Sequence, residues 1–202
     1  MNGHRPAPGD VFELKVQLRD IEPAIWRTVL LPVEAPLGIL HEVIQVVFGW
    51  HGDHQHEFEV AGIRFASDED DDEDAVPCVH EYAAPLGAIA SVGTTFLYRY
   101  DHGDDWRHDV TVQGVAQADE DTADDRVFSC TGGSRAAPPN DCGGPPGYAH
   151  LLQVLADPTH ADYEELKELA PHGFDAAKFD LAEVNERLVA LLLELEQRQS
   201  GS

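Results

Sequence analysis

The stretch 96–112, which reads FLYRYDHGDDWRHDVTV, gives the strongest indication of the fold. Two runs rich in aromatic and β-branched residues flank a short segment of Asp and Gly, and this arrangement is typical of a β-hairpin. Side chains alternate along a strand, so Tyr98 and Tyr100 share one face of the first strand, and Trp106 and His108 share one face of the second. The sequence therefore predicts a sheet that carries aromatic rings and an imidazole beside the carboxylates of the turn.

Hydrophobic patterns on both sides of this hairpin predict an α+β fold. Residues 12–18 alternate apolar and polar side chains, which predicts a half-buried strand, and 25–31 predict a second one. Between 37 and 48 apolar residues recur every three or four positions, which predicts a helix that ends at Gly49. Further apolar stripes between 148 and 195 predict C-terminal helices. We therefore expect a mainly antiparallel sheet covered by one early helix and a C-terminal helical segment.

The length of the chain fits a single domain, predicted at 11–198, with flexible ends at 1–10 and 199–202. The segment 67–76 contains a dense run of carboxylates and is predicted to be a disordered acidic loop. Residues 130–148, CTGGSRAAPPNDCGGPPGY, are rich in Gly and Pro. They are predicted to form a long loop with no regular element, and such a loop is more often functional or specifically packed than idle.

The charge of the chain limits its partners. Lys and Arg total 13 against 38 Asp and Glu, a formal charge of -25, so direct nucleic-acid binding through the phosphate backbone is disfavoured. The sequence has no apolar run of the roughly 18 residues that a membrane helix needs and no signal-peptide pattern, which predicts a cytoplasmic protein without membrane contact. Three cysteines in such a chain are expected to be reduced thiols.

Several short motifs occur in order along the chain: Glu22-Pro23-Ala24-Ile25-Trp26-Arg27, Phe48-Gly49-Trp50, His56-Glu57-Phe58, Gly103-Asp104-Asp105-Trp106-Arg107-His108 and Asp141-Cys142-Gly143-Gly144. Together they resemble one family, the plasmid pRiA4b ORF-three-like family, whose members are often labelled insertion-element passenger TnpR proteins. The resemblance covers roughly Phe12 to Leu188 and implies a compact α+β domain, with no particular reaction or substrate.

The chain departs from the family pattern in the Gly- and Pro-rich loop. It has Ala137 and Asn140 where the family commonly shows Cys and Glu, which weakens an essential metal-binding or catalytic role for the loop. The TnpR label suggests a resolvase, yet a serine recombinase needs a nucleophilic Ser among arginines that stabilise phosphate charge. The sequence shows no such constellation.

A metal site is the most specific chemical hypothesis, because imidazole, thiolate and carboxylate groups are the usual ligands of zinc and related divalent metals. The spacings support it weakly, since neither CxxC nor HExxH occurs. The alternative, which the sequence favours, is that the histidines are hydrogen-bonded at sheet edges and the cysteines are small buried hydrophobes. The candidate ligands are His54, His56, Asp104, His108, Cys130 and Cys142.

A ligand pocket is predicted between the hairpin, the histidine-bearing segment before it and the loop 130–148. The competing interpretation places the aromatic rings in the core and gives the Asp residues a turn-forming role. Four arginines of the strands, Arg27, Arg64, Arg99 and Arg107, are expected to form ion pairs with surface carboxylates. The candidate pocket residues are His56, Tyr98, Tyr100, Asp101, Trp106, Arg135 and Asp141.

Three functions follow from these candidates. The first is an accessory or binding domain that acts through a protein or small-ligand partner. The second is a metal-dependent hydrolase or nuclease that uses His56, Asp104 and His108. The third is a mobile-element accessory, in transposition or recombination, that works through a partner bound to DNA. The residues define no complete catalytic constellation, so the sequence does not decide whether the chain is an enzyme.

Overall fold

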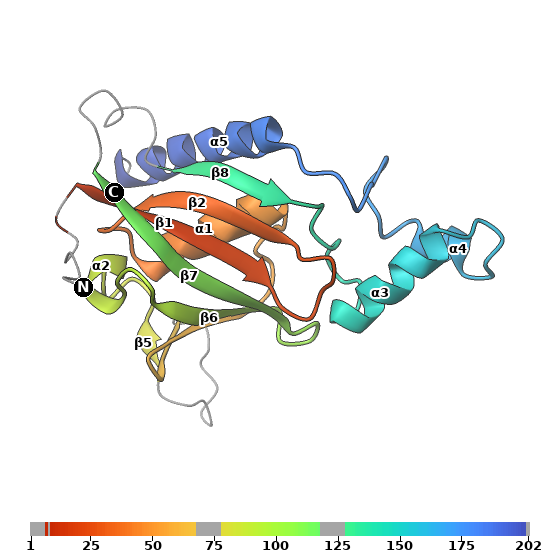
Figure 1. Cartoon of the computed structure of the whole chain (residues 1–202), viewed down its shortest axis with the longest axis horizontal. Coiled ribbons are helices and arrows are strands. Elements are labelled where there is room, and N and C mark those ends of the chain that lie inside the picture. Colours follow the sequence, from red (N-terminus) through yellow and green to blue (C-terminus); the bar gives the residue numbers. More distant parts are fainter. Residues whose placement is uncertain (1–6, 8, 68–77, 118–127, 201–202) are drawn as a thin grey trace.

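The computed structural model of this chain describes residues 7, 9–67, 78–117 and 128–200 (Figure 1). The predicted flexible ends and the acidic loop 67–76 fall largely outside the described residues. The elements are β1 (Asp10–Leu18), β2 (Trp26–Pro32), α1 (Leu37–Phe48), β3 (His56–Val60), β4 (Ile63–Ala66), β5 (Val79–His80), α2 (Leu86–Ile89), β6 (Thr95–Tyr100), β7 (Trp106–Gln117), β8 (Ser129–Ser134), α3 (Gly144–Leu155), α4 (Tyr163–Leu166) and α5 (Leu181–Ser200).

These strands form one sheet in the order β5-β4-β3-β6-β7-β1-β2-β8. The pairs are antiparallel except β4 with β5, which run parallel. The predicted hairpin supplies β6 and β7 in the middle of the sheet, with Tyr98 opposite His108 and Tyr100 opposite Trp106. The mixed architecture confirms the predicted α+β class.

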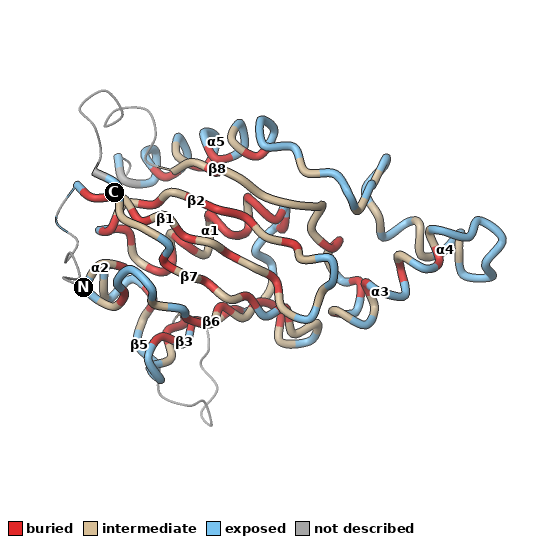
Figure 2. The backbone as a smooth tube through the Cα atoms, viewed as in Figure 1, coloured by how far each residue is buried: buried red, intermediate tan, exposed pale blue. Residues whose placement is uncertain are grey.

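One face of the sheet is covered by helices and forms the core. The alternating residues Phe12, Leu14, Val16 and Leu18 of β1 are at most 1% exposed, as a strand with one buried face requires. Helix α1 lies behind the strands in Figure 1, and α5 packs against α1 and β8. Figure 2 shows burial concentrated in the strands and α1, whereas the outer side of α5 and α4 are exposed. Among the described helices, none is long and apolar enough to cross a bilayer.

Helix α1 begins and ends where the apolar spacing predicts. Its buried stripe includes Leu37, Leu40, Ile44 and Val47. Gly49 ends the helix at φ +73°, and its N–H donates to carbonyls of the last turn. This left-handed conformation is costly for residues with a Cβ, so glycine is well suited to the position.

The Gly- and Pro-rich stretch 130–148 differs from its prediction, because it contains regular structure at both ends. Strand β8 includes Cys130 and pairs with β2, and α3 begins at Gly144. Gly133 suits this edge strand, since a Cβ there would lie 2.6 Å from the Phe179 ring. Prolines at the first positions of α3 are tolerated, because the N–H groups they lack have no partner inside a helix.

Candidate metal centre

The turn between β6 and β7 fixes the position of the Asp101 carboxylate. The Asp101 backbone N–H donates to the Gln55 carbonyl at 2.9 Å, which holds the segment before β3 against the turn. Asp101 Oδ1 accepts hydrogen bonds from the N–H groups of Gly103 at 2.9 Å and Asp104 at 3.2 Å. This local bonding is what Asp provides in tight turns. It leaves Asp101 Oδ2 on the side that faces His54.

His54 lies between two carboxylates that come from distant parts of the chain. Its Nε2 is 3.2 Å from Asp141 Oδ1 and 3.7 Å from Asp101 Oδ2. The three ligand atoms all lie within 4.8 Å of one another. Among the described residues, this is the only group of three or more His, Cys, Asp or Glu side chains placed closely enough to hold one metal ion. The side chains are 35% exposed for His54, 12% for Asp101 and 69% for Asp141. We call these three residues the His54 cluster.

The spacing of the His54 cluster suits a small divalent metal. Ligands bound to zinc at about 2.0–2.1 Å in a tetrahedron lie about 3.3–3.4 Å apart. The separations of 3.2 and 3.7 Å from His54 Nε2 are close to that value, and the two carboxylate oxygens lie within 4.8 Å of each other, so side-chain movement would be needed to bring all three ligands to one ion. One imidazole and two carboxylates are also a donor set that transition metals accept. Three protein ligands leave at least one coordination position for water or another oxygen ligand.

Tyr100 forms the inner wall beside this cluster. Its ring centroid is 5.8 Å from that of His54, and the residue is only 1% exposed. The hydroxyl makes no hydrogen bond of normal geometry to a described residue and lies near the backbone of Asp53 and His54. Burial, reinforced by the nearby carboxylates, raises the pKa of Tyr100 to about 12. The phenol therefore keeps its proton at neutral pH.

The loop that carries Asp141 is fastened to the rest of the site at several points. Trp50 Nε1 donates to the Pro138 carbonyl at 2.9 Å, and the Asn140 amide nitrogen lies 2.8 Å from His51 Nδ1. Gly143 N–H donates to Asp104 Oδ2 at 3.1 Å. These contacts hold the loop against both the hairpin and the segment before β3. Asp104, a predicted ligand, therefore positions the loop and is not part of the cluster.

Glycine permits the close approach of this loop to the turn. A Cβ on Gly144 would lie 2.3 Å from the Asp104 carbonyl oxygen, and Gly144 has φ +67°. Both features restrict the position to glycine. The loop is thus specifically packed at its junction with α3.

His56, a candidate in both predicted sets, lies in a buried network and not in the His54 cluster. Its Nε2 is 2.7 Å from Glu81 Oε2, and its ring stacks on that of His41 with centroids 3.5 Å apart. His41 Nδ1 lies 2.8 Å from the Tyr98 hydroxyl, which also accepts a hydrogen bond from Gln45 Nε2 at 2.8 Å. These contacts give His56 and Tyr98 structural roles beneath α1.

The sequence interpretation missed two members of this network, His41 and Glu81. His41 follows Leu37 by four residues, so it belongs to the apolar stripe of α1, and this position could have indicated an inward-facing imidazole. Glu81 offers no comparable signal, because it follows a two-residue strand, β5. Burial, with the neighbouring His56 in support, lowers the pKa of His41 to about 3.

His108 is fully buried at the centre of the sheet, apart from the other predicted ligands. Its ring packs edge-on against Phe48 at 4.9 Å and Trp50 at 5.4 Å between centroids. Neither ring nitrogen makes a hydrogen bond of normal geometry to a described residue. Burial lowers the pKa of His108 to about 3, so the imidazole is neutral. Trp106 is likewise a core residue, 1% exposed and tilted against Trp50.

The two predicted cysteine ligands do not join a common site. Cys130 lies in β8, five strand positions from β3, which is about 24 Å at a strand spacing of about 4.8 Å. Cys142 is buried close to Asp104, and burial first and that carboxylate second raise its pKa to about 12. Neither cysteine belongs to the His54 cluster. The six candidate ligands therefore do not form one site. His54 is the only one of them that belongs to the cluster.

The arginines of the strands behave as expected with one exception. Arg64, Arg99 and Arg107 pair with nearby carboxylates of Glu57 and Asp105. Arg27 has no carboxylate partner among the described residues and donates to backbone carbonyls. The expectation of a surface ion pair is therefore wrong for Arg27, because β2 places its side chain in the interior under α1.

The residues predicted to line one pocket lie in different parts of the structure. Asp101 and Asp141 belong to the His54 cluster, and Tyr100 forms its inner wall. Arg135 has φ +67°, and its carbonyl accepts a hydrogen bond from Arg27 Nη2 at 2.9 Å. It therefore contributes through its backbone, on the side of the loop that faces Arg27.

The fold and site together define an acidic α+β protein with a candidate cation site where the central hairpin meets a glycine-rich loop. The chain belongs to the plasmid pRiA4b ORF-3-like family, whose model matches residues 10–183. This confirms the family indicated by the sequence motifs.

Two relatives extend the comparison. The chain is 32% identical over 178 residues to the uncharacterized protein y4hQ of Sinorhizobium fredii, a match that covers 87% of this chain and 89% of the relative. It is also similar to the crystal structure of MM3350, a protein of unknown function from Methanosarcina mazei Go1, with a TM-score of 0.77 and 32% identity. That alignment covers 88% of this chain and 98% of MM3350.

Proposed function

We propose that this protein is a binding domain whose ligand is a divalent transition metal ion of the zinc class, held by His54, Asp101 and Asp141. The observation that carries the proposal is the position of His54 Nε2, 3.2 Å and 3.7 Å from two carboxylate oxygens. These separations are close to those between ligands of one zinc ion, about 3.3–3.4 Å.

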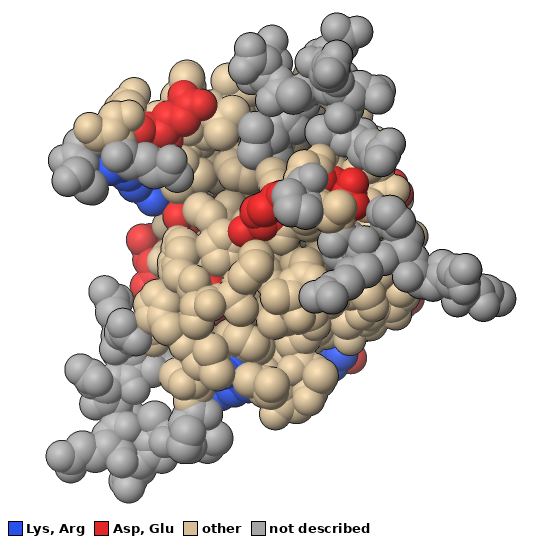
Figure 3. Space-filling model, turned by 90° about the vertical axis from the view of Figure 1, so that its left-hand side faces the viewer, with Lys and Arg blue, Asp and Glu red and all other residues tan. Residues whose placement is uncertain are grey.

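The surroundings of the cluster support a cation. The formal charge of -25 attracts cations toward the protein as a whole. Figure 3 shows the end of the molecule that lies on the left in Figure 1, away from the β6–β7 turn; there too carboxylates of the described residues occur in several places, so the negative charge is not confined to the cluster. The backbone bonds to Asp101 Oδ1 also orient its carboxylate, as outer-shell partners orient metal ligands in proteins.

The open coordination position suggests how the metal would be used. A bound ion with three protein ligands can accept an oxygen atom from a small ligand or from a partner protein, which agrees with an accessory or binding domain. The same open position favours a metal-dependent hydrolase as the second candidate, because metal-bound water is a nucleophile at neutral pH. In that case the protonated Tyr100, whose ring centroid lies 5.8 Å from that of His54, is a candidate donor to a developing negative charge.

The direct test is metal binding by protein purified without an affinity tag. We expect one zinc ion per chain by isothermal titration and elemental analysis, and at least about a tenfold loss of affinity in His54→Ala and in Asp141→Asn. His150→Ala is the matched control, since His150 is an exposed histidine on α3 outside the cluster. Absence of zinc binding, or equal affinity in the two cluster variants and the control, would refute the proposal.

A further inference from the structure

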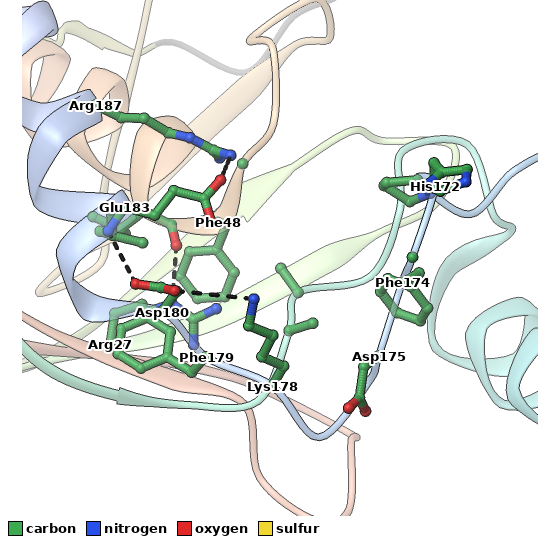
Figure 4. A pocket seen from close by; sticks show the side chains of 17 residues that line it. Arg27, Phe48, His172, Phe174, Asp175, Lys178, Phe179, Asp180, Glu183 and Arg187 are labelled. Atoms are coloured by element: carbon green, nitrogen blue, oxygen red, sulfur yellow. Dashed lines mark hydrogen bonds and ion pairs between the residues drawn. The ribbon is translucent and has the colours of Figure 1, made fainter.

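A second cavity, separate from the His54 cluster, lies around Arg27. It has a volume of about 250 Å³ and lies between the C-terminal end of α1, the first turns of α5, the backbone after β8 and the segment 171–180 (Figure 4). Residues of the segment 171–180 form one wall, and Figure 4 shows Phe179 beside Arg27, with Lys178 next to them. None of the three residues of the His54 cluster lines this cavity.

Arg27 brings an uncompensated positive charge to the cavity. The residue is 2% exposed, and its guanidinium carbon lies 5.1 Å from the Phe48 ring centroid and 4.3 Å from that of Phe179. Its Nε and Nη atoms donate to the carbonyls of Val47, Trp26, Ser134 and Arg135. These bonds use four of the five guanidinium N–H groups and leave one on Nη2. Carbonyls satisfy hydrogen bonds without neutralising the charge.

The other charged groups of the lining are largely neutralised in pairs. Lys178 Nζ lies 3.9 Å from Asp180 Oδ2, and Arg187 forms an ion pair with Glu183. Asp175 accepts a hydrogen bond from the Ala177 N–H, and its carboxylate is directed away from Arg27 in Figure 4. The lining therefore has one buried cation whose charge no described side chain balances. Although burial lowers the pKa of Arg27 to about 10, the group remains cationic at neutral pH.

Apart from its charged groups and His172, the lining consists of glycine and apolar residues, some of them aromatic. Phe48, Phe174 and Phe179 contribute rings, and Val47 and Val184 contribute aliphatic side chains. The volume is smaller than the roughly 300–1,000 Å³ of sites for drug-sized ligands, so the occupant must be small. An apolar body with a single negative charge matches both the walls and the unbalanced guanidinium.

We infer that this cavity binds a small aromatic monocarboxylate, with its ring among Phe48, Phe174 and Phe179 and its carboxylate toward Arg27. The site is independent of the proposed metal, because the two share no side chain. A neutral ligand of the same shape would gain the apolar contacts without the ionic one, and a cation would be repelled. Tighter binding of the anion than of its neutral or cationic counterpart is therefore the result expected for this site.

Benzoate is the probe, and benzamide and benzylamine are its neutral and cationic counterparts. We expect benzoate to bind the full chain at millimolar concentrations in NMR titrations, at least about tenfold more tightly than benzamide, with no binding of benzylamine. The Arg27 Nε–H signal should shift with benzoate, which places the ligand at the guanidinium. Replacement of Arg27 itself would leave four carbonyls without donors and endanger folding, so a different variant is needed.

Ala137→Leu fills the cavity and leaves every hydrogen bond of Arg27 in place, since Ala137 is a lining residue outside that bonding. It should weaken benzoate binding at least about tenfold. Ala149→Leu, on an exposed position of α3, is the control and should bind like the natural chain. The inference is overturned if benzoate does not bind at millimolar concentrations, if benzamide binds equally well, or if Ala137→Leu has no effect. A failure of the protein to bind zinc would not overturn this inference, because the two sites share no side chain.

Discussion

Acid should destabilise this protein well before its carboxylates are protonated, because two imidazoles are buried in the neutral form. His41 and His108 each have a pKa of about 3 in the folded chain, against an ordinary value of 6.5, and burial is the main cause for both. With the folded pKa lowered, the unfolded chain binds the proton first. The contribution to stability is therefore complete above pH 6.5 and is lost as the pH falls toward 3.

The size of the effect follows from these values. Each histidine lowers the free energy of unfolding by up to about 1.4 kcal/mol per pH unit below 6.5. At about pH 5 this amounts to roughly 2 kcal/mol for the fully buried His108 and somewhat less for His41, which retains some exposure. We expect guanidinium chloride unfolding to show a loss of about 3–4 kcal/mol between neutral pH and pH 5.

The variant His108→Leu isolates one of the two groups. Its stability at neutral pH should stay within about 1.5 kcal/mol of the natural chain, because the new side chain is apolar and of similar volume. Between neutral pH and pH 5, the free energy of unfolding of this variant should decrease by roughly 2 kcal/mol less than that of the natural chain. His150→Ala, at an exposed position, should keep the full loss. Equal acid losses in the natural chain and His108→Leu would refute the reasoning.

Two further variants test a buried contact beneath α1 and the junction of the loop that carries Asp141. Glu81→Ala removes the partner of His56 in a buried pair and should lower the free energy of unfolding by about 1–3 kcal/mol in denaturant titrations, whereas no change would show that the 2.7 Å contact contributes nothing. Gly144→Ala should lower it by at least about 1–3 kcal/mol and weaken zinc binding, because the new Cβ meets the Asp104 carbonyl at a positive φ. An unchanged zinc affinity of Gly144→Ala would show that the position of the loop does not affect metal binding by the cluster.

The fold was predictable where a local pattern determines the element. The apolar spacing of α1 and its Gly49 end, the alternation of β1 and the hairpin 96–112 all depend on residues close together in sequence. Strand β8 was missed because Gly132 and Gly133 indicate a loop. Their place in an edge strand becomes clear only when Trp26 and Phe179, from β2 and the segment before α5, are seen to pack against them.

The sequence identified the residue types of the site, but it did not show which of the candidate residues lie together. His54, Asp101 and Asp141 each stood among the candidates, but no spacing relates a residue before β3 to one in the loop before α3. Their proximity depends on the Gln55 bond to the turn and on the Trp50 bond to Pro138, which are long-range contacts. The burial of His56 and His108 depends on packing beneath α1, which the strand pattern alone does not reveal.

The most direct measurement is anomalous diffraction at the zinc absorption edge from crystals grown with zinc. We expect an anomalous peak bounded by His54 Nε2, Asp101 Oδ2 and Asp141 Oδ1, with metal–ligand distances of about 2.0–2.2 Å. His54→Ala crystals should lack that peak. A peak elsewhere, or none between these three side chains at saturating zinc, would contradict the proposed metal centre.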